Sequence, residues 1–425
     1  MQITTKLKGW MQVAALVAAA SLVAACGGGG GDSGSSSSNS GNDGINSLPA
    51  GPTQQPIAVG AANTVAITVD KGLKNVINIP TVSVQICAPR TTNCQIIDHV
   101  QLDTGSYGLR IVSTALNATL APALPVTLVN GAQQLAECAS FADGFTWGSV
   151  RTADVTLGQK QAASLPVQII GDLAAASVPA SCSGVPENTV DDLRVNGILG
   201  IGVMPNDCGT TCSDPSQAPT SSNYYGCTGN TCTRTVAATG VQVANPVPKF
   251  SGDNNGVIVQ LPPVPNTGAA SAQGTLVFGI NTQPNNALTA AQSFLSDAAG
   301  DLPGSTFNGN PAVALFDTGS NGYFFDDSTL AACGSNEPGF YCPPTAQTRP
   351  FTVKGTGSAS ATVDMNVVSA ATLISSGGNF AFNDVAGEGI RAGWVDLGLP
   401  FFFGRYVYYG MDLSATGGPA PFIAF

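Results

Sequence analysis

Short apolar and β-branched runs, broken by glycine and proline, recur along most of this chain. A clear example is Ile96-Ile97-Asp98-His99-Val100-Gln101-Leu102, where apolar and polar positions alternate as they do in a half-buried strand. Helical periodicity is scarce, and the best helix candidates are the segments 286–296 and 328–332. The pattern therefore predicts an all-β protein with many short strands and few short helices.

The composition changes this picture in two ways. With 425 residues, of which 43% are hydrophobic and 10% charged, the chain can bury a core larger than one small domain needs, so two lobes are expected. The 51 glycines and 28 prolines favour strands joined by tight turns. A formal net charge of -11 argues against nucleic acid as a partner and otherwise indicates only solubility.

The N-terminal region has the features of an export signal. Residues 1–25 combine a short basic start with an apolar stretch, which predicts a signal peptide. The small residues Val23-Ala24-Ala25 before Cys26 resemble the bacterial lipobox, which implies cleavage and lipid attachment at Cys26. The alternative is an ordinary signal with a chance cysteine.

The segment after that cysteine is predicted to tether the folded part to a membrane. Residues 26–57 are rich in glycine and serine, as in a flexible, disordered linker. Gly27, where an acid could stand, is similar to the sorting pattern of Gram-negative lipoproteins and implies the outer membrane. No later apolar run reaches the roughly 18 residues that a spanning helix needs, so the lipid is the predicted anchor.

The remaining ten cysteines form an even set, which in an exported chain predicts disulfides. Cys87 with Cys94, and Cys333 with Cys342, are the natural local pairs. Four others lie in one loop-rich insertion, where they form disulfides or, alternatively, a zinc site. The four are Cys208, Cys212, Cys227 and Cys232, and the set is completed by Cys138 and Cys182.

The histidine content excludes several mechanisms. His99 is the one histidine of the chain, so no mechanism that needs two imidazoles is possible. A Ser-His-Asp triad would have to use His99, which lies in the alternating segment described above and is expected to pack in a strand. The glycine run 27–31 belongs to the tether and does not follow a strand as a phosphate loop would.

A duplicated tetrapeptide offers a different chemistry. Asp103-Thr104-Gly105-Ser106 and Asp317-Thr318-Gly319-Ser320 each follow a short apolar run. Glycine lets backbone amides approach the carboxylate, and the hydroxyls supply further hydrogen bonds. Two such carboxylates brought together share one proton, so one can activate water while the other donates to the developing oxyanion. This hydrolysis needs no metal and no cofactor.

At these motifs the chain resembles the pepsin family of aspartic proteases. Further similar segments are Gly197–Gly202 and Leu397–Phe402, which match the apolar-Gly crossing of each pepsin lobe. The strand Gly274–Asn281 and the stretch Arg405–Asp412 also follow the family's order, and the resemblance covers roughly residues 75 to 425. It implies two pseudo-symmetric, β-barrel-like lobes with a central cleft, here residues 58–240 and 241–425, with Asn245-Pro246-Val247-Pro248 as the crossing.

Carried over residue by residue, the resemblance assigns roles to both motifs. Asp103 and Asp317 would be the catalytic pair. Thr104 and Thr318 would brace the two loops against each other, while Ser106 and Ser320 would bond the outer aspartate oxygens, beside Gly105 and Gly319. The implied activity is that of an envelope-anchored endopeptidase, which cuts peptide or protein substrates bound between the lobes.

The chain departs from the family at the hairpin that covers the cleft. The matching region 141–148 has no tyrosine, so Phe141 or Trp147 are the flap candidates, unless they simply pack under the hairpin. The segment Ser106-Tyr107-Gly108-Leu109-Arg110 also differs from the family pattern. The layout is similar to an uncharacterised family of Gram-negative lipoproteins. The alternatives are therefore a catalytically silent pepsin-fold binding or structural module of the envelope, or an adhesive β-protein suggested by composition alone.

Overall fold

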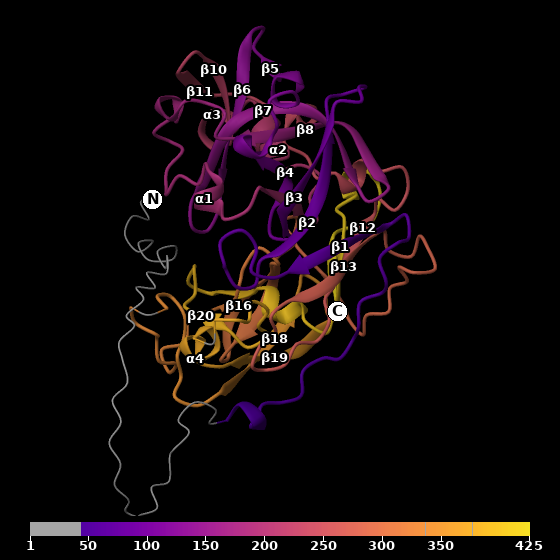
Figure 1. Cartoon of the computed structure of the whole chain (residues 1–425). Coiled ribbons are helices and arrows are strands. Elements are labelled where there is room, and N and C mark those ends of the chain that lie inside the picture. The colour runs from indigo at the N-terminus through magenta and orange to yellow at the C-terminus, as the bar shows by residue number, and fades with distance from the viewer. Residues whose placement is uncertain (1–43, 336, 376) are drawn as a thin grey trace, which may run out of the picture.

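The computed structural model describes residues 44–335, 337–375 and 377–425 (Figure 1). The predicted signal peptide, Cys26 and the tether up to residue 43 lie outside the described residues. Residues 44–57, predicted as part of the disordered tether, instead pack on the folded chain. Ile45 is 7% exposed in a cluster with Ile77 and Phe382, and the Gln54 amide donates to the carbonyl of Gly404. Apolar burial and backbone pairing thus begin earlier than the glycine-rich composition suggested.

Strands dominate the described residues, as predicted. The larger sheet runs in the order β11-β10-β6-β7-β8-β4-β9-β3-β2-β1-β13-β12-β22-β23-β14, with β5 paired to β6. An additional pairing of β2 with β7 closes part of it into a barrel. Its strands are β1 (Thr64–Val69), β2 (Pro80–Cys87), β3 (Cys94–Asp103), β4 (Tyr107–Val112), β5 (Leu128–Val129), β6 (Gln133–Ser140), β7 (Phe145–Leu157), β8 (Lys160–Ile170), β9 (Gly197–Ile201), β10 (Tyr224–Thr228), β11 (Thr231–Arg234), β12 (Gly256–Gln260), β13 (Ala272–Phe278), β14 (Ser293–Leu295), β22 (Tyr406–Gly410) and β23 (Phe422–Ala424).

A second sheet of seven strands builds the other lobe, in the order β19-β18-β15-β16-β21-β17-β20. In Figure 1 this lobe occupies the lower part of the picture, β3 to β11 occupy the upper part, and β1, β12 and β13 lie between them. The expected all-β, two-lobed, barrel-like architecture is therefore confirmed. The strands are β15 (Leu302–Phe307), β16 (Asn310–Phe316), β17 (Tyr323–Phe324), β18 (Gln347–Lys354), β19 (Ser360–Val367), β20 (Ala386–Gly387) and β21 (Trp394–Leu397).

The two lobes repeat one strand arrangement. In the first, β3 pairs in parallel with β9, β9 pairs antiparallel with β4, and β4 pairs in parallel with β8. In the second, β16, β21, β17 and β20 pair with the same sequence of directions. Each D-T-G-S tetrapeptide begins where the first strand of its set ends, so the repeat places both tetrapeptides at equivalent positions.

The lobes are not independent sheets. Strand β1 of the first half pairs with β13 of the second half over its whole length, from Thr64 opposite Val277 to Val69 opposite Ala272. A domain boundary near residue 240 stays a prediction, because strands from both sides of that position share the larger sheet. One apolar cluster likewise contains residues of both lobes, including Leu102, Leu199, Phe316 and Leu397.

Helices are few and short in the described residues, and none has the length and hydrophobicity to cross a bilayer. They are α1 (Val190–Leu193), α2 (Thr210–Ser213), α3 (Ala218–Ser221) and α4 (Ala370–Ile374). Both predicted helices, 286–296 and 328–332, are wrong.

Side chains and tertiary pairing explain why those two segments are not helical. The Asn286 side chain accepts from the amides of Thr282 and Gln283, and β14 inside this segment pairs with β23. The Asp327 carboxylate accepts from the amide and hydroxyl of Thr329, which fixes a turn.

All ten cysteines of the described residues form disulfides. The predicted pairs Cys87–Cys94 and Cys333–Cys342 are confirmed. The zinc alternative is wrong, because its four thiols are consumed in two local bridges. The remaining bonds are Cys138–Cys182, Cys208–Cys212 and Cys227–Cys232.

Candidate active site

The structure brings the two predicted aspartates together. Asp103 is the last residue of β3, and Asp317 directly follows β16. The amide of Gly105 lies 2.8 Å from Oδ1 of Asp103 and 3.1 Å from Oδ1 of Asp317, so one N–H faces both carboxyls. The amide of Gly319 donates to Oδ1 of Asp317 at 2.7 Å. Residues far apart in the sequence therefore form one acidic pair.

The glycines of both tetrapeptides are required by this close approach. A Cβ on Gly105 would lie 2.6 Å from Cγ of Asp317, and one on Gly319 would lie 2.9 Å from Oδ1 of Asp103. Each glycine thus leaves space for the aspartate of the opposite loop. Any larger residue would push the carboxyls apart.

The two threonines join the loops by reciprocal hydrogen bonds. The Thr104 amide donates to the Thr318 hydroxyl at 3.1 Å, and the Thr318 amide donates to the Thr104 hydroxyl at 2.9 Å. Each hydroxyl in turn donates across the lobes, Thr104 to the carbonyl of Phe316 and Thr318 to that of Leu102. Both threonines are buried, so water does not compete for these bonds.

The serines and one glutamine complete the support. Oγ of Ser106 lies 2.5 Å from Oδ2 of Asp103, and Oγ of Ser320 lies 2.9 Å from Oδ2 of Asp317. The side-chain amide of Gln101 donates to the carbonyl of Gly319 at 3.0 Å. Sequence reasoning missed Gln101, although its position on the strand leading to Asp103 was the available signal.

The electrostatics of the pair favour a shared proton. Burial raises the pKa of Asp317 well above its ordinary value, and the neighbouring carboxyls of Asp103 and Asp396 raise it further. Asp103 is itself only 7% exposed. Two carboxylates this close repel each other, so a proton shared between them is favoured.

Three further residues close to the pair were not assigned by sequence reasoning. The Tyr107 hydroxyl donates to the carbonyl of Ala299, and burial together with Asp301, Asp297 and the pair raises the pKa of this phenol. Burial and the neighbouring Asp297 raise the pKa of Asp301 to about 7.

Asp396, 6% exposed in β21, lies within hydrogen-bond distance of the Ser320 hydroxyl. A lone acid in the apolar run Trp394–Leu397 was the signal that could have identified it.

The hairpin formed by β6 and β7 carries the two flap candidates, which have different environments. Phe141 lies at its turn, half-buried, with the Arg110 guanidinium 5.9 Å from its ring centre. Trp147 is 1% exposed; its indole N–H donates to the Ser177 hydroxyl and its ring meets Tyr225 edge-on at 5.5 Å. Trp147 therefore packs within the lobe and leaves Phe141 as the flap candidate.

Arg110, the last residue of the segment 106–110 that differs from the family pattern, is an internal anchor for that hairpin. Its guanidinium lies 2.6 Å from Glu137 on β6 and 3.1 Å from Asp207, all with side chains at most 5% exposed. The Tyr224 hydroxyl donates to the same Asp207. A buried charge needs such pairing, so Arg110 fixes β6 relative to the strand that follows Asp103.

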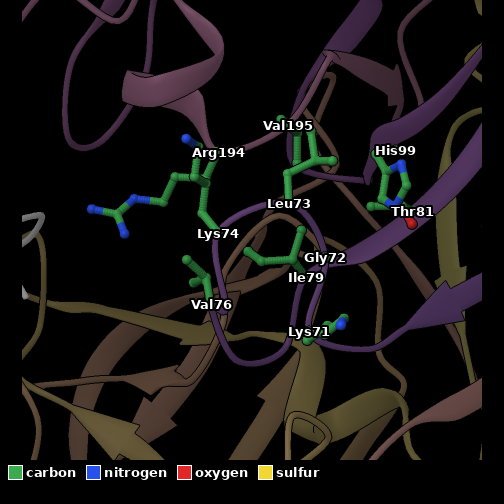
Figure 2. Close-up of a pocket in the computed structure, with 10 residues that line it drawn as sticks. All are labelled: Lys71, Gly72, Leu73, Lys74, Val76, Ile79, Thr81, His99, Arg194 and Val195. Atoms are coloured by element: carbon green, nitrogen blue, oxygen red, sulfur yellow. The ribbon is translucent and has the colours of Figure 1, made fainter. Parts of the chain in front are cut away.

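The pocket drawn in Figure 2 lies elsewhere and is not a ligand site. It is lined by the loop from Lys71 to Val76 together with His99 and Arg194, and its volume is about 10 Å³. Such a space holds roughly one water molecule. His99 lies within β3, as expected, but at a bulge against β2, where its φ of 54° is left-handed. The described residues contain no cluster of His, Cys, Asp and Glu that could bind a metal ion.

Comparison with known proteins places the chain in a family of unknown function. The family model described as "Protein of unknown function (DUF3443)" matches residues 59–425. No curated protein matches the chain. Among solved structures, an aspartic proteinase from Irpex lacteus is similar, with 14% sequence identity and a TM-score of 0.48, over 85% of this chain and 96% of that one.

Proposed function

This chain is a member of the DUF3443 family, and from its site we propose that it is an aspartic endopeptidase that hydrolyses peptide bonds with a water held between Asp103 and Asp317. The observation that carries the proposal is the Gly105 amide, which lies 2.8 Å from one carboxyl and 3.1 Å from the other. Reciprocal threonine bonds that fix this geometry support it further.

The chemistry follows from the shared proton. The ionised aspartate takes a proton from the water as its oxygen attacks the peptide carbonyl carbon. The protonated partner donates to the carbonyl oxygen, which would otherwise become an oxyanion. When the tetrahedral intermediate collapses, the aspartate that took the proton of the water gives it to the leaving nitrogen and the C–N bond breaks. A hydroxyl of the intermediate returns its proton to the other aspartate as the carboxyl product forms, which restores the single shared proton.

Protein or peptide chains are the proposed substrates. Gly105 is exposed, while the braced face of each loop is buried, so a substrate would approach the pair from the Gly105 side. The hairpin turn lies near the pair, because Asp103, in addition to burial, contributes to the raised pKa of Asp143 in this turn, and Phe141 of the same turn is the proposed apolar contact for the substrate.

We also propose that the protein is exported and anchored to the outer membrane by a lipid on Cys26. Fractionation of cells that produce a Cys26→Ser variant tests this anchor. Release of the variant into the soluble fraction supports the anchor, and membrane retention equal to wild type contradicts it.

The test of the activity is cleavage of a denatured protein between about pH 3 and pH 7. Wild type is compared with Asp103→Asn and Asp317→Asn, and with Asp98→Asn as a matched control on the exposed face of the same strand. Cleavage by wild type and Asp98→Asn, and loss in both site variants, supports the proposal. Equal cleavage by all four proteins ends it.

One observation favours a second candidate, a catalytically silent binding module. Trp147 is buried and the hairpin turn has no tyrosine, so the covering group of the pepsin family is replaced. This candidate predicts that a statine-type inhibitor or an unfolded peptide binds without turnover. Turnover that both aspartate substitutions abolish eliminates it.

A further inference from the structure

A third carboxyl is connected to the proposed pair through one hydroxyl. Oγ of Ser320 lies 2.9 Å from Oδ2 of Asp317 and 2.6 Å from Oδ2 of Asp396. A serine hydroxyl has one proton and can donate it to one of these oxygens only. Because the other contact is also of hydrogen-bond length, the proton in it must come from the carboxyl. One of the two aspartates therefore carries a proton directed at Ser320.

The surroundings of Asp396 identify it as the protonated one. Its side chain is 6% exposed, and its Oδ1 is buried without a hydrogen-bond partner, an arrangement that is far more costly for a carboxylate than for a neutral carboxyl. Asp317, in contrast, accepts two amide hydrogen bonds on its other oxygen.

The groups that face Asp396 are acidic or neutral. On either side in the sheet lie Leu315 of β16 and Phe324 of β17. Burial raises the pKa of Asp396 to about 8, the Ser320 hydrogen bond lowers it in part, and the carboxyls of Asp103 and Asp301 raise it. Asp396 in turn contributes to the raised pKa of Asp317 and, with both aspartates of the pair, to that of the buried Tyr409.

The equivalent position in the first lobe shows that this carboxyl is an addition to the repeat. Asp396 pairs with Leu315, one residue before Phe316 opposite Leu397. In the first lobe Ile198 pairs with Gln101, one residue before Leu102 opposite Leu199. Ser106 consequently contacts the carboxyl of Asp103 alone.

We propose that Asp396 is a positioning residue that holds a proton and donates it to Ser320, so that the Ser320 hydroxyl donates to Oδ2 of Asp317 and fixes the orientation of this carboxyl in the pair. The catalytic part of this inference rests on the proposed function. When Asp396 loses its proton, the Ser320 hydroxyl turns to it, Asp317 loses its outer donor, and activity falls. Asp396 thereby sets the alkaline limit of the reaction.

The substitution Asp396→Asn keeps a donor toward Ser320 and removes the ionisation. We expect its kcat/KM near the acidic optimum to stay within about threefold of wild type, and the alkaline limb of its pH profile to move up by on the order of one pH unit. The matched control is Asp384→Asn, a buried carboxyl of the same lobe whose pKa is also raised, which should leave the limb in place. If the alkaline limb of the Asp396→Asn pH profile stays at its wild-type position, the proposal is overturned.

Infrared spectroscopy separates the proton on Asp396 from the proposed function. Infrared difference spectra against pH should show a protonated carboxyl at neutral pH that is absent in Asp396→Asn, and they need no substrate. An unchanged band overturns the assignment even if the wild type cleaves peptides. Inactive wild type with the expected band refutes the endopeptidase and leaves the proton on Asp396 standing.

Ser320→Ala tests the connection and does not depend on the folding of Asp396→Asn. Loss of the Ser320 hydrogen bond should raise the pKa of Asp396, seen as an upward shift of the same infrared titration. In the Ser320→Ala background, Asp396→Asn should move the alkaline limb no further. A second shift of equal size would show that Asp396 acts by charge alone and would contradict the positioning role.

Discussion

Gly105 offers a sharp test of how closely the two loops must approach. A Cβ built on Gly105 lies 2.6 Å from Cγ of Asp317, whereas carbon atoms in good contact are about 3.5 to 4.0 Å apart. The substitution Gly105→Ala must therefore displace one carboxyl by about 1 Å. A misplacement of that size lowers catalysis by about a hundredfold, and the overpacking costs about 1 to 3 kcal/mol of stability.

The expected ranking of variants makes the reasoning refutable. Gly319→Ala has its nearest contact at 2.9 Å, so the displacement and the loss of kcat/KM should be smaller than in Gly105→Ala. Gly240→Ala, with no atom within 4 Å of its new Cβ, should behave as wild type. The assay is peptide cleavage together with thermal unfolding. A folded Gly105→Ala protein that retains full activity would show that the pair does not need the observed separation.

Three other predictions concern stability. Thr318→Val removes a buried hydroxyl that bonds the amide of Thr104 and the carbonyl of Leu102, and urea unfolding should show a loss of about 2 to 4 kcal/mol; a loss below the error of the measurement would contradict the bracing role. Burial raises the pKa of Asp384 to about 7 in the folded state. Between about pH 4 and pH 7 this carboxyl is therefore protonated in the folded state and ionised in the unfolded state, so the free energy of unfolding should fall as the pH rises through this window. Asp384→Asn should flatten that fall by on the order of 4 kcal/mol, and an unchanged pH dependence would refute the assignment. Replacing Cys138 and Cys182 by alanine opens a crosslink with a sequence separation of 44 and should cost about 4 kcal/mol in the same assay, against about 2 kcal/mol for the bridge of separation 4 between α2 and the preceding loop; equal losses would disfavour the loop-entropy account.

The sequence predicted those parts of the candidate site whose functional groups lie next to one another along the chain. Each D-T-G-S tetrapeptide contains the carboxyl, the glycine that admits its partner and the hydroxyl that bonds its outer oxygen, so the duplication alone indicated an acidic pair. The local disulfide Cys87–Cys94 was predictable for the same reason, since it joins the ends of β2 and β3 across the turn of one hairpin.

Features created by pairing between distant strands were beyond such reasoning. Nothing in the spacing between Ser320 and Asp396 indicates contact, and only the parallel pairing of β16 with β21 brings them together. The helix expected at 286–296 failed for a related reason, because the partner strand β23 lies at the far end of the chain. Trp147 was considered for the flap, but its strand register directs it to the buried face, opposite Cys138.

The pairing of β1 with β13 has a consequence for how the chain matures. The first strand to be made finds its partner only when the second half of the chain has emerged, so until then its edge is open to pairing with other molecules. A fragment that ends near residue 240 would keep this edge permanently unpaired and should aggregate. Production of either half alone is therefore expected to fail where the intact chain succeeds.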